Sequence, residues 1–406
     1  MDVAIVGAGA AGLMTAIWAG RTDSRRSIVA LDGASRLGAK ILIAGGGRCY
    51  VTHDVVDEQA FAGSSRNAIR NVLRRFDVPE TVAFFRELGV VLKREDTGKL
   101  FPTTDRAQTV LDALLAAAQA AGIVVRHPWR VETVERTDDG FTVAGPAGSL
   151  RARSVVIATG GRSVPKTGSD GHGFVIARGL GHTVTPRLLP ALVPLTLSRD
   201  HFLTTLAGVS TQVTLEVRAG SGRRLARFTD SLLCAHFGVS GPVVLDASRH
   251  WTAARADDPD AHLTVGWLPG ETLESTDTWL REPGPSAGRR LHARRLPERL
   301  ARALCVEAGI DPGAPSHELT RERRRALATV LVEMPLPVTG DRGFTHAEVT
   351  AGGVPLAEIR LQTMASRIVP GLHLCGEICD VDGRIGGYNF QWAWASGYVA
   401  GISVGR

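Results

Sequence analysis

The ten residues from Val3 to Gly12, VAIVGAGAAG, constrain this chain more than any other stretch. The apolar run VAIV has the length of a strand, a Gly-x-Gly-x-x-Gly turn follows at once, and residues 13–20 have helical character. A strand, a glycine turn and a helix in this order are typical of a dinucleotide-binding βαβ unit. Gly7 permits the sharp turn, Gly9 leaves the backbone open to a pyrophosphate, and Gly12 lets helix and strand pack closely.

The fingerprint also predicts an acidic residue about 20 residues further on, which binds a ribose hydroxyl. Asp32 supplies this residue, directly after the apolar run 28–31. Ala10 and Ala11 would begin the helix, whose unpaired N–H groups and partial positive charge attract phosphates. The alternative is an ordinary βαβ unit with chance glycines. With the strand, the helix and Asp32 in register, the sequence predicts that the start of the chain binds a dinucleotide.

The composition is that of a soluble globular protein. Of the 406 residues, 44% are hydrophobic and 22% are charged, and the chain is long enough for two or three domains. No secretory leader is recognisable, and the apolar helical stretch 110–125 is too short to span a bilayer. Five cysteines, an odd number in a long chain, favour a reduced, cytoplasmic protein. Cys375 and Cys379 lack a second Cys/His pair nearby, so no metal site is expected.

Further glycine turns recur along the chain. Residues 38–49, GAKILIAGGGRC, contain three successive glycines, which favour a loop that hugs a ligand over a helix or strand. Buried strands that end in glycines are predicted at 155–161 and 371–377, and a glycine turn precedes a final helix at 391–399. From about residue 191 the pattern changes to short, alternating runs without a long helix, which indicates an antiparallel sheet or a small barrel.

We therefore predict an α/β protein whose Rossmann-like domain is discontinuous, with an inserted β-rich and helical domain. The expected parts are the Rossmann-like domain at 1–190 and 350–406, a β-rich, barrel-like domain at 191–270 and 336–349, and a basic helical insertion at 271–335.

Five ordered motifs point to a family: GAGAAG, Lys40 with GGGRC, the strand VVIATGG, TAGGV at 350–354, and GLHLCGEICDVDGRIGGYNFQWAWASG at 371–397. With these motifs the chain resembles, over nearly its full length, the bacterial BaiN-like NAD(P)/FAD-dependent oxidoreductases. These are flavoproteins of the glutathione-reductase-like FAD fold. The resemblance implies FAD on the first fingerprint and NAD(P)H as the electron donor, although a second full Gly-x-Gly-x-x-Gly is absent.

The resemblance also implies where FAD lies. The predicted FAD-contacting residues are Gly7, Gly9, Ala10, Ala11, Gly12, Asp32, Gly38, Lys40, Gly45, Gly46, Gly47, Arg48, Val131, Ala158, Thr159, Gly160, Gly376, Glu377, Gly387, Tyr388 and Asn389. Val131 would lie near the adenine, Glu377 near the ribityl and pyrophosphate groups, and the helix after Gly387 would aim N–H groups at the flavin N1/O2 edge. Tyr50 and His53 stand where the family usually has asparagine, which leaves the substrate open.

Four side chains are candidates for chemistry, each with a structural alternative. Lys40 would contact a phosphate or polarise the flavin, or is a surface lysine. Arg48 would bind an anion or a flavin carbonyl, or forms an ion pair that holds the loop. Cys49, where the neighbouring arginine would favour a thiolate, would give a proton to a substrate carbon, or is a packing residue. His236 would be a general acid or substrate contact, or a structural turn histidine.

The helical insertion is rich in arginine. The chain carries a net charge of +6, and Arg281, Arg289, Arg290, Arg294, Arg295, Arg299, Arg302, Arg321, Arg323, Arg324 and Arg325 lie within this insertion. An arginine-rich helical face suits a phosphate backbone, although it can equally be a solvated face. The predicted partners are therefore a small molecule or RNA, and no membrane is expected.

The function predicted from these features is an FAD-dependent oxidoreductase. We expect an NAD(P)H-linked reductase that delivers a hydride from flavin N5 to a C=C bond. Three alternatives stay open: a dihydrouridine synthase acting on ribosomal RNA, which the family resemblance implies, an amine or amino-ketone oxidase that releases peroxide, and a non-catalytic, flavin-containing RNA-binding protein. The oligomeric state does not follow from the sequence.

Overall fold

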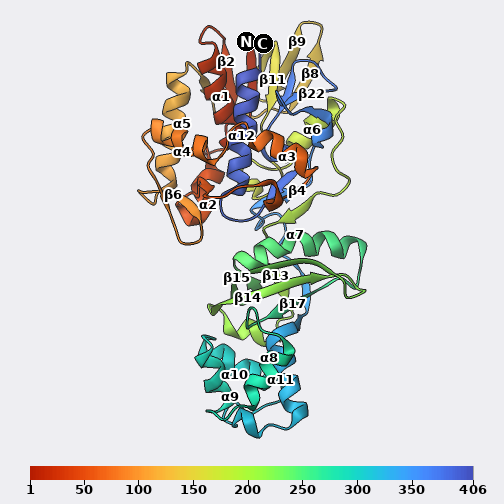
Figure 1. Ribbon diagram of the computed structural model, residues 1–406. Coiled ribbons are helices and arrows are strands. Elements are labelled where there is room, and N and C mark those ends of the chain that lie inside the picture. The colour runs from red at the N-terminus through yellow and green to blue at the C-terminus, as the bar shows by residue number, and fades with distance from the viewer. Residues whose placement is uncertain (406) are drawn as a thin grey trace. The chain divides into compact units, whose positions relative to one another are not determined.

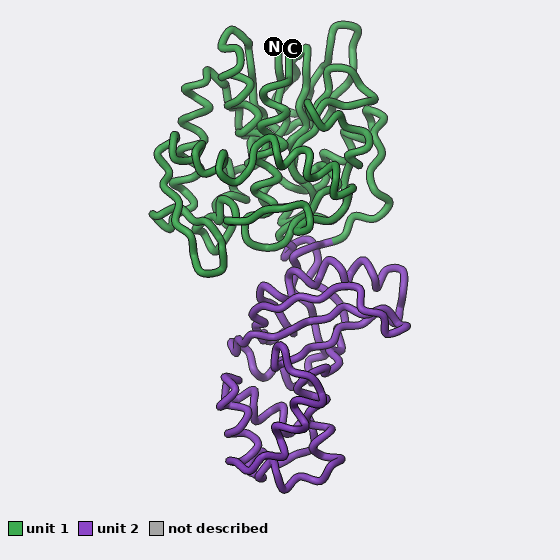
Figure 2. Tube along the Cα trace, in the orientation of Figure 1, with its two compact units in different colours: residues 1–189, 348–406 green, residues 190–347 purple. Residues whose placement is uncertain are grey.

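The computed structural model describes residues 1–405, and the chain divides into two compact units. Unit 1 comprises residues 1–189 and 348–406, and unit 2 comprises residues 190–347 (Figure 2). The first unit is thus assembled from the two ends of the chain. The predicted insertion, 191–349, lies within the second unit except for its last two residues, 348 and 349, which belong to unit 1.

Unit 1 is built on a seven-stranded sheet in the order β21-β22-β23-β11-β1-β2-β7. Five strands run parallel: β1 (Val3–Val6), β2 (Ile28–Leu31), β7 (Val124–Arg126), β11 (Ser154–Ile157) and β23 (Leu372–Leu374). At one side of the sheet, β21 (Ile359–Arg360) at the edge and β22 (Ala365–Ser366) next to it pair in antiparallel fashion. Strands β1, β2 and β11 are buried along their whole length, as runs of valine, isoleucine and alanine in a covered parallel sheet are expected to be. The predicted α/β Rossmann-like fold is confirmed.

The first and last helices of unit 1 pack closely on each other. They are α1 (Ala10–Thr22) and α12 (Tyr388–Ser403), which lie side by side in Figure 1. A Cβ at Gly397 would lie 2.6 Å from the carbonyl oxygen of Ala11, and one at Gly401 would lie 2.6 Å from that of Thr15. Only glycine permits this approach, which joins the C-terminal helix to the N-terminal fingerprint.

The glycine-rich stretch 38–49 differs from its prediction as a loop. Helix α2 (Ala39–Gly47) begins directly after Gly38, and its helical geometry is interrupted at Ala44, which is extended. Gly45, Gly46 and Gly47 then adopt positive φ angles of 58°, 68° and 86°. The apolar AKILI segment forms a helical turn, and the left-handed conformations lie outside it, at Gly38 before it and at Gly45–Gly47 and Cys49 after it.

Other elements of unit 1 surround this sheet. The helices are α3 (Arg66–Leu73), α4 (Val78–Glu87), α5 (Ala107–Ala120) and α6 (His172–Gly179), and the short 3₁₀ helix η6 spans Gly376–Ile378. Small sheets are formed by β3 (Thr52–His53) with β5 (Leu92–Arg94) and β6 (Lys99–Pro102), by β8 (Thr133–Thr137) with β9 (Gly140–Gly145) and β10 (Gly148–Ala152), and by β4 (Phe61–Gly63) with β24 (Val381–Gly383). Strand β20 spans Val349–Ala351. Helix α12 begins at Tyr388, three residues earlier than predicted, because Gly387 takes the left-handed conformation directly before it.

Unit 2 contains an antiparallel seven-stranded sheet in the order β18-β17-β14-β15-β16-β13-β19. The strands are β13 (Leu195–Leu197), β14 (Ser210–Arg218), β15 (Arg224–Ala235), β16 (Gly238–Ser240), β17 (His262–Gly266), β18 (Met334–Leu336) and β19 (Val338–Asp341). The sheet has two edges, so it is the antiparallel sheet of the prediction and not a closed barrel.

The helices of unit 2 are α7 (Pro242–Asp257), which packs on β14 and β15, and a group formed by α8 (Leu273–Arg281), α9 (Ala287–Ala293), α10 (Glu298–Glu307) and α11 (Arg321–Glu333). These helices share one apolar core with the sheet. Within residues 1–405, no helix combines the length and the apolar character needed to cross a membrane.

Candidate active site

The three fingerprint glycines have different surroundings. A Cβ at Gly7 would lie 2.4 Å from the carbonyl oxygen of Ala158, and one at Gly12 would lie 1.9 Å from that of Gly7. A Cβ at Gly9 would meet nothing within 4 Å, and Gly9 has an ordinary φ of −79°. Gly7 and Gly12 are therefore needed for packing, while the missing side chain of Gly9 leaves room for a ligand in front of the α1 N-terminus. This is the place where a pyrophosphate would bind.

Asp32 follows β2 at the carboxyl ends of the parallel strands, where the glycine turn also lies. Its carboxylate accepts hydrogen bonds from Ala8 N at 2.7 Å and from Ala34 N at 2.8 Å. These contacts fix the glycine turn to the end of β2. A carboxylate can accept about four hydrogen bonds, so Asp32 retains the capacity to bind a ribose hydroxyl.

Segments that follow two other strands border this position. Trp129 N donates to the carbonyl oxygen of Asp32 at 2.6 Å, which brings the buried Val131 into the neighbourhood of the β2 end. At the end of β11, Ala158 N donates to Val6 O at 2.8 Å, and Gly160 has a φ of 73°. The structure therefore brings Asp32, Val131 and the Ala158–Gly160 turn around the fingerprint; their contacts with FAD stay a prediction.

A second group of polar residues meets at Glu377. Lys40 Nζ donates to Glu377 Oε2 at 2.6 Å and to Ser163 Oγ at 2.6 Å. The other carboxylate oxygen of Glu377 accepts from Ser163 Oγ at 2.9 Å and from Thr350 N at 2.9 Å. The Glu377 side chain is only 18% exposed and Ser163 is fully buried. Lys40 is thus not a free surface lysine, because it neutralises a largely buried carboxylate.

The Asp32 group and the Glu377 group lie at the carboxyl ends of two different strands of the same sheet. Asp32 follows β2 and Glu377 follows β23, and these strands lie on opposite sides of β1. The 3₁₀ helix η6, which contains Glu377, rests on the fingerprint helix, since a Cβ at Gly376 would lie 2.7 Å from Ala11 Cβ. A dinucleotide with its ribose at Asp32 and its pyrophosphate at Gly9 would extend its other end towards Glu377. We call this the redox end of the site.

The loop at residues 49–53 is fastened to α12 near the redox end. Trp394 Nε1 donates to Val51 O at 2.8 Å, and Thr52 Oγ1 donates to the buried Gln391 side chain at 2.7 Å. The His53 ring stacks on Tyr388, with ring centres 4.9 Å apart. These contacts hold the loop against the first turns of α12, whose N-terminal end presents backbone N–H groups and a partial positive charge.

Asn389 has a local role in the turn before α12. Its side chain accepts from Gly383 N at 2.8 Å and donates to Gly383 O at 2.9 Å, so it holds β24 against the start of the helix. Gly387 is tightly packed, because a Cβ there would lie 2.4 Å from the carbonyl carbon of Thr52. Both residues thus shape the helix N-terminus.

Tyr50 is the aromatic hydroxyl of the loop, and it is buried. The residue is 9% exposed, and its phenol donates to Glu348 Oε2 at 2.5 Å. Its ring lies against Phe101 and Phe390, with ring centres 6.0 and 6.2 Å away. Burial raises the pKa of Tyr50 well above its usual range, and the neighbouring Glu348 raises it further. The phenol is therefore neutral at physiological pH.

Arg48 turns away from this cluster. It forms an ion pair with Glu95 at 2.6 Å and lies over the Phe101 ring at 4.0 Å. These contacts fit the alternative in which Arg48 holds the loop to the β5–β6 hairpin.

Cys49 is fully buried, and burial raises its pKa to about 12. The expected thiolate is therefore disfavoured, because desolvation outweighs the effect of the neighbouring arginine. His236 lies in unit 2, exposed in the turn between β15 and β16 beside Phe237. The catalytic roles of Cys49 and His236 stay predictions.

One arrangement outside this site has the geometry of a hydrolase triad. His182 Nδ1 lies 2.7 Å from Glu358 Oε2, and its Nε2 lies 2.8 Å from Ser366 Oγ. However, Ser366 Oγ also accepts from Ile368 N and Val369 N at 3.0 and 2.8 Å, and both His182 and Ser366 are buried. The Ser366 hydroxyl is thus hydrogen-bonded within the protein and inaccessible to a substrate. The cluster therefore has a structural role, in which it joins His182 to the segment 358–369.

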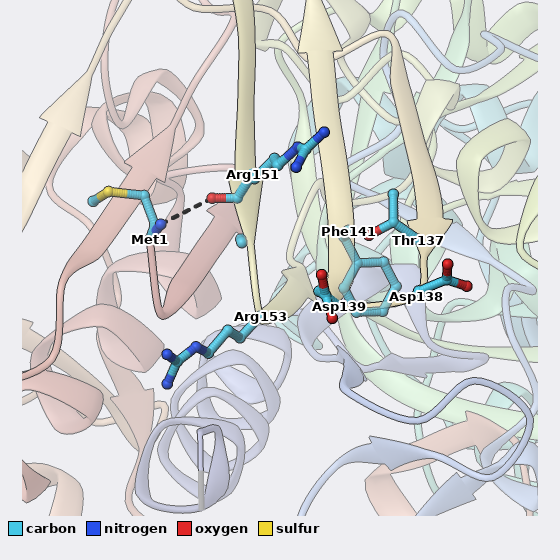
Figure 3. Close-up of a pocket in the computed structure, with 8 residues that line it drawn as sticks. Met1, Thr137, Asp138, Asp139, Phe141, Arg151 and Arg153 are labelled. Carbon is cyan, nitrogen blue, oxygen red and sulfur yellow. Dashed lines mark hydrogen bonds between the residues drawn. The ribbon is translucent and has the colours of Figure 1, made fainter.

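A pocket of about 360 Å³ lies at a different place in unit 1. It is lined by Met1, Thr137, Asp138, Asp139, Phe141, Arg151, Ala152 and Arg153 (Figure 3). Met1 precedes β1 and Arg153 precedes β11, so the pocket lies at the amino ends of the parallel strands. Ligands of such sheets bind at the carboxyl ends, and the pocket is not part of the candidate site.

The fold and the site together define a class of protein. A discontinuous Rossmann-like unit, a glycine turn open at Gly9 and an acid after β2 are the features of a dinucleotide-binding oxidoreductase. The family model described as "HI0933-like protein Rossmann domain" matches residues 1–403. The chain belongs to this HI0933-like family.

Relatives of known name match along the whole chain. The chain is 33% identical to a 3-dehydro-bile acid delta(4,6)-reductase of Clostridium scindens, covering 98% of both chains. It is also 33% identical to a ribosomal RNA dihydrouridine synthase of Escherichia coli, covering 98% of this chain and 96% of that protein. The solved 3-ketosteroid delta1-dehydrogenase of Sterolibacterium denitrificans shares the fold, with 12% identity, a TM-score of 0.54 and 99% of both chains covered.

Sequence reasoning missed three members of the cluster. Ser163, Glu348 and Thr350 were not singled out as site residues, although Ser163 follows the glycine-ended strand and Thr350 begins the TAGGV motif. Glu348 stands two residues before that motif, and its position alone carries no signal. Its role depends on Tyr50, which lies about 300 positions earlier in the chain.

We expect Gly9→Ala to weaken FAD binding and Gly12→Ala to lower the stability of the fold. Ala at position 9 has space and an allowed backbone, so it should leave the thermal midpoint unchanged and weaken FAD binding by about 100-fold, because the methyl group occupies the pyrophosphate position. Ala at position 12 overlaps the Gly7 carbonyl and should cost about 1–3 kcal/mol of stability. Flavin fluorescence titration and thermal unfolding measure the two effects. Unchanged FAD affinity in Gly9→Ala would contradict this placement of the pyrophosphate.

Lys40→Met is expected to weaken FAD binding roughly tenfold, because it leaves the Glu377 carboxylate without its cation at the redox end of the site. Lys93→Met is the matched control, since it removes the same charge from an exposed pair with Asp105. Isothermal titration of both apoproteins with FAD gives the comparison. Equal affinities in the two variants would show that the Lys40–Glu377 pair does not face the cofactor.

Proposed function

We propose that the protein reduces a C=C bond that is conjugated to a carbonyl group. FAD, when bound, would supply the two electrons and one hydrogen that such a reduction needs. The protein must supply the proton that adds to the second carbon. The observation that supports this proposal is the redox end itself, where Lys40, Ser163, Glu377, Tyr50 and Glu348 form linked polar contacts beside the start of α12.

One reaction class reconciles the names of the two relatives. A delta(4,6)-reductase of a 3-dehydro-bile acid, as its name states, removes ring double bonds in a molecule that carries an oxidised position 3. A dihydrouridine synthase saturates the C=C bond of a uracil ring, which is also conjugated to a carbonyl. Both named reactions therefore add hydrogen across a C=C bond, and they differ in the size of the substrate.

A uridine in ribosomal RNA is the second candidate substrate, and exposed arginines of unit 2 favour it. Part of the arginine-rich insertion is engaged within the protein: Arg290 is buried against Trp279, and Arg324 pairs with Asp277 at 2.7 Å. Other arginines of α9–α11 and their connections are exposed: Arg289, Arg295, Arg302, Arg321, Arg323 and Arg325. Arginines exposed in this way can bind phosphates.

We further propose NAD(P)H as the electron donor, visiting the flavin through the opening that the substrate uses, and the cytoplasm as the place of action. The five cysteines are all free and buried, which suits a reducing compartment.

Anaerobic reduction of the FAD-loaded protein tests the proposal. We expect NADPH or NADH to bleach the flavin, and an enone such as progesterone or cyclohexenone to restore its colour faster than air does. Stopped-flow absorbance measures each step. Bleaching by an amine with release of peroxide would indicate the oxidase instead. Tight RNA binding without any bleaching would indicate the non-catalytic alternative.

The RNA candidate predicts a role for the exposed arginines. Replacing Arg321, Arg323 and Arg325 with glutamate should weaken binding of unmodified ribosomal RNA by more than tenfold and lower its salt dependence. A matched triple replacement of Arg66, Arg74 and Arg75 in unit 1, which are exposed too, changes the net charge equally. Filter binding at several salt concentrations compares the two. Equal losses would mean that net charge, and not this surface, governs RNA binding.

A further inference from the structure

The buried Tyr50 and the half-buried Glu348 form a hydrogen-bonded pair at the redox end. The phenol donates to Glu348 Oε2 at 2.5 Å, and the backbone carbonyl of Glu348 lies 3.1 Å from Ser163 Oγ. Ser163 in turn contacts Glu377 at 2.9 Å. Tyr50 is thus joined through two residues to the carboxylate that follows β23, where the dinucleotide path ends.

The phenol is held in place from several sides. Val51 N donates to Leu100 O at 2.8 Å, and Val51 O accepts from Trp394, so the backbone next to Tyr50 is tied to both the hairpin and α12. The ring itself packs between Phe101 and Phe390. Such a preorganised O–H group requires little rearrangement to reach a bound substrate.

We propose that the Tyr50 hydroxyl is the proton donor to the substrate, and that Glu348 is a positioning residue for it. This inference rests on the proposed C=C reduction. FAD, when bound and reduced, would supply a hydride to the carbon remote from the carbonyl. As that C–H bond forms, the π bond of the C=C breaks and its electron pair moves towards the carbonyl. The Tyr50 O–H bond breaks, and its proton forms a C–H bond at the neighbouring carbon. Water then returns a proton to the phenolate, so the overall reaction consumes two electrons and two protons.

Other protic groups of the site suit this step less well. Lys40 is shared between Glu377 and Ser163, and releasing its proton would leave Glu377 without a cation. Cys49 lies in the apolar core of unit 1 with no exposed surface. A phenol, in contrast, remains protonated at neutral pH and is still far more acidic than the carbon next to a ketone, so proton transfer to that carbon is favourable.

The test uses FAD-loaded protein reduced with dithionite in the absence of oxygen. Tyr50→Phe should slow flavin reoxidation by progesterone or cyclohexenone by about 100-fold. Reoxidation by ferricyanide, which takes electrons without protonation of a carbon, should be unchanged. Tyr398→Phe is the matched control. Tyr398 lies in α12, where its ring packs on Trp18 and Phe76, away from the Tyr50–Glu348 pair.

The outcomes separate this inference from the proposed function. Equal enone rates in the wild type and in Tyr50→Phe would overturn the inference alone. If ferricyanide reoxidises the flavin of the wild-type protein but no enone does so, both the inference and the proposed function are overturned. A Tyr50→Phe variant that is equally slow towards ferricyanide would show that Tyr50 only supports the flavin site, which also contradicts the inference.

A second measurement needs no turnover. The chain has three tyrosines, so the ultraviolet difference between the wild type and Tyr50→Phe during an alkaline titration isolates one phenol. We expect Tyr50 to ionise at a higher pH than a free tyrosine, because its burial and the neighbouring Glu348 raise its pKa. Glu348→Gln should lower the pH at which Tyr50 ionises, because the neighbouring negative charge is gone. Ionisation of Tyr50 near the pH of a free tyrosine, or no shift in Glu348→Gln, would overturn the pairing on which the inference depends.

Discussion

The close backbone approaches around Ala11 are the constraint on which unit 1 depends. A side chain at Gly12 would overlap Gly7, one at Gly376 would overlap Ala11 Cβ, and one at Gly397 would overlap Ala11 O. Three segments from the two ends of the chain therefore meet at the first turn of α1. Because the contacts at Gly12 and Gly397 are made with backbone atoms, which cannot move aside as a side chain can, a larger residue at either position would displace the chain next to the nucleotide site.

The polar groups at the redox end are the second determinant of the site. Glu377 is largely withdrawn from water, and a carboxylate in such a position needs charge and hydrogen bonds in compensation. Lys40, Ser163 and the Thr350 N–H provide them, and each comes from a different segment of the chain. The same carboxylate thereby fixes α2 and the ends of β11 and β23 relative to one another. One network thus neutralises the carboxylate and joins these segments.

Residues with local physical signals were predictable from the sequence. The fingerprint glycines, Asp32 and the buried parallel strands follow from periodicity and from the absence of Cβ atoms, and the confirmed fold follows from them. The stretch 38–49 was only partly predictable, since its apolar half forms helix α2 before the glycines turn. The thiolate at Cys49 was wrong because the sequence shows the neighbouring arginine and not the depth of burial, and burial decides the pKa.

The sequence by itself determined the class of fold and the nucleotide fingerprint, because a strand, a glycine turn and an acid at fixed spacing are local properties of the chain. Only the tertiary structure decided the partners of Lys40, Arg48 and Tyr50, because each partner is distant in sequence or has no motif of its own. An arginine next to a glycine loop can bind a ligand or a hairpin. A tyrosine can pack against other side chains or donate a hydrogen bond. Which of these happens depends on the charge and burial that the folded chain assembles around it.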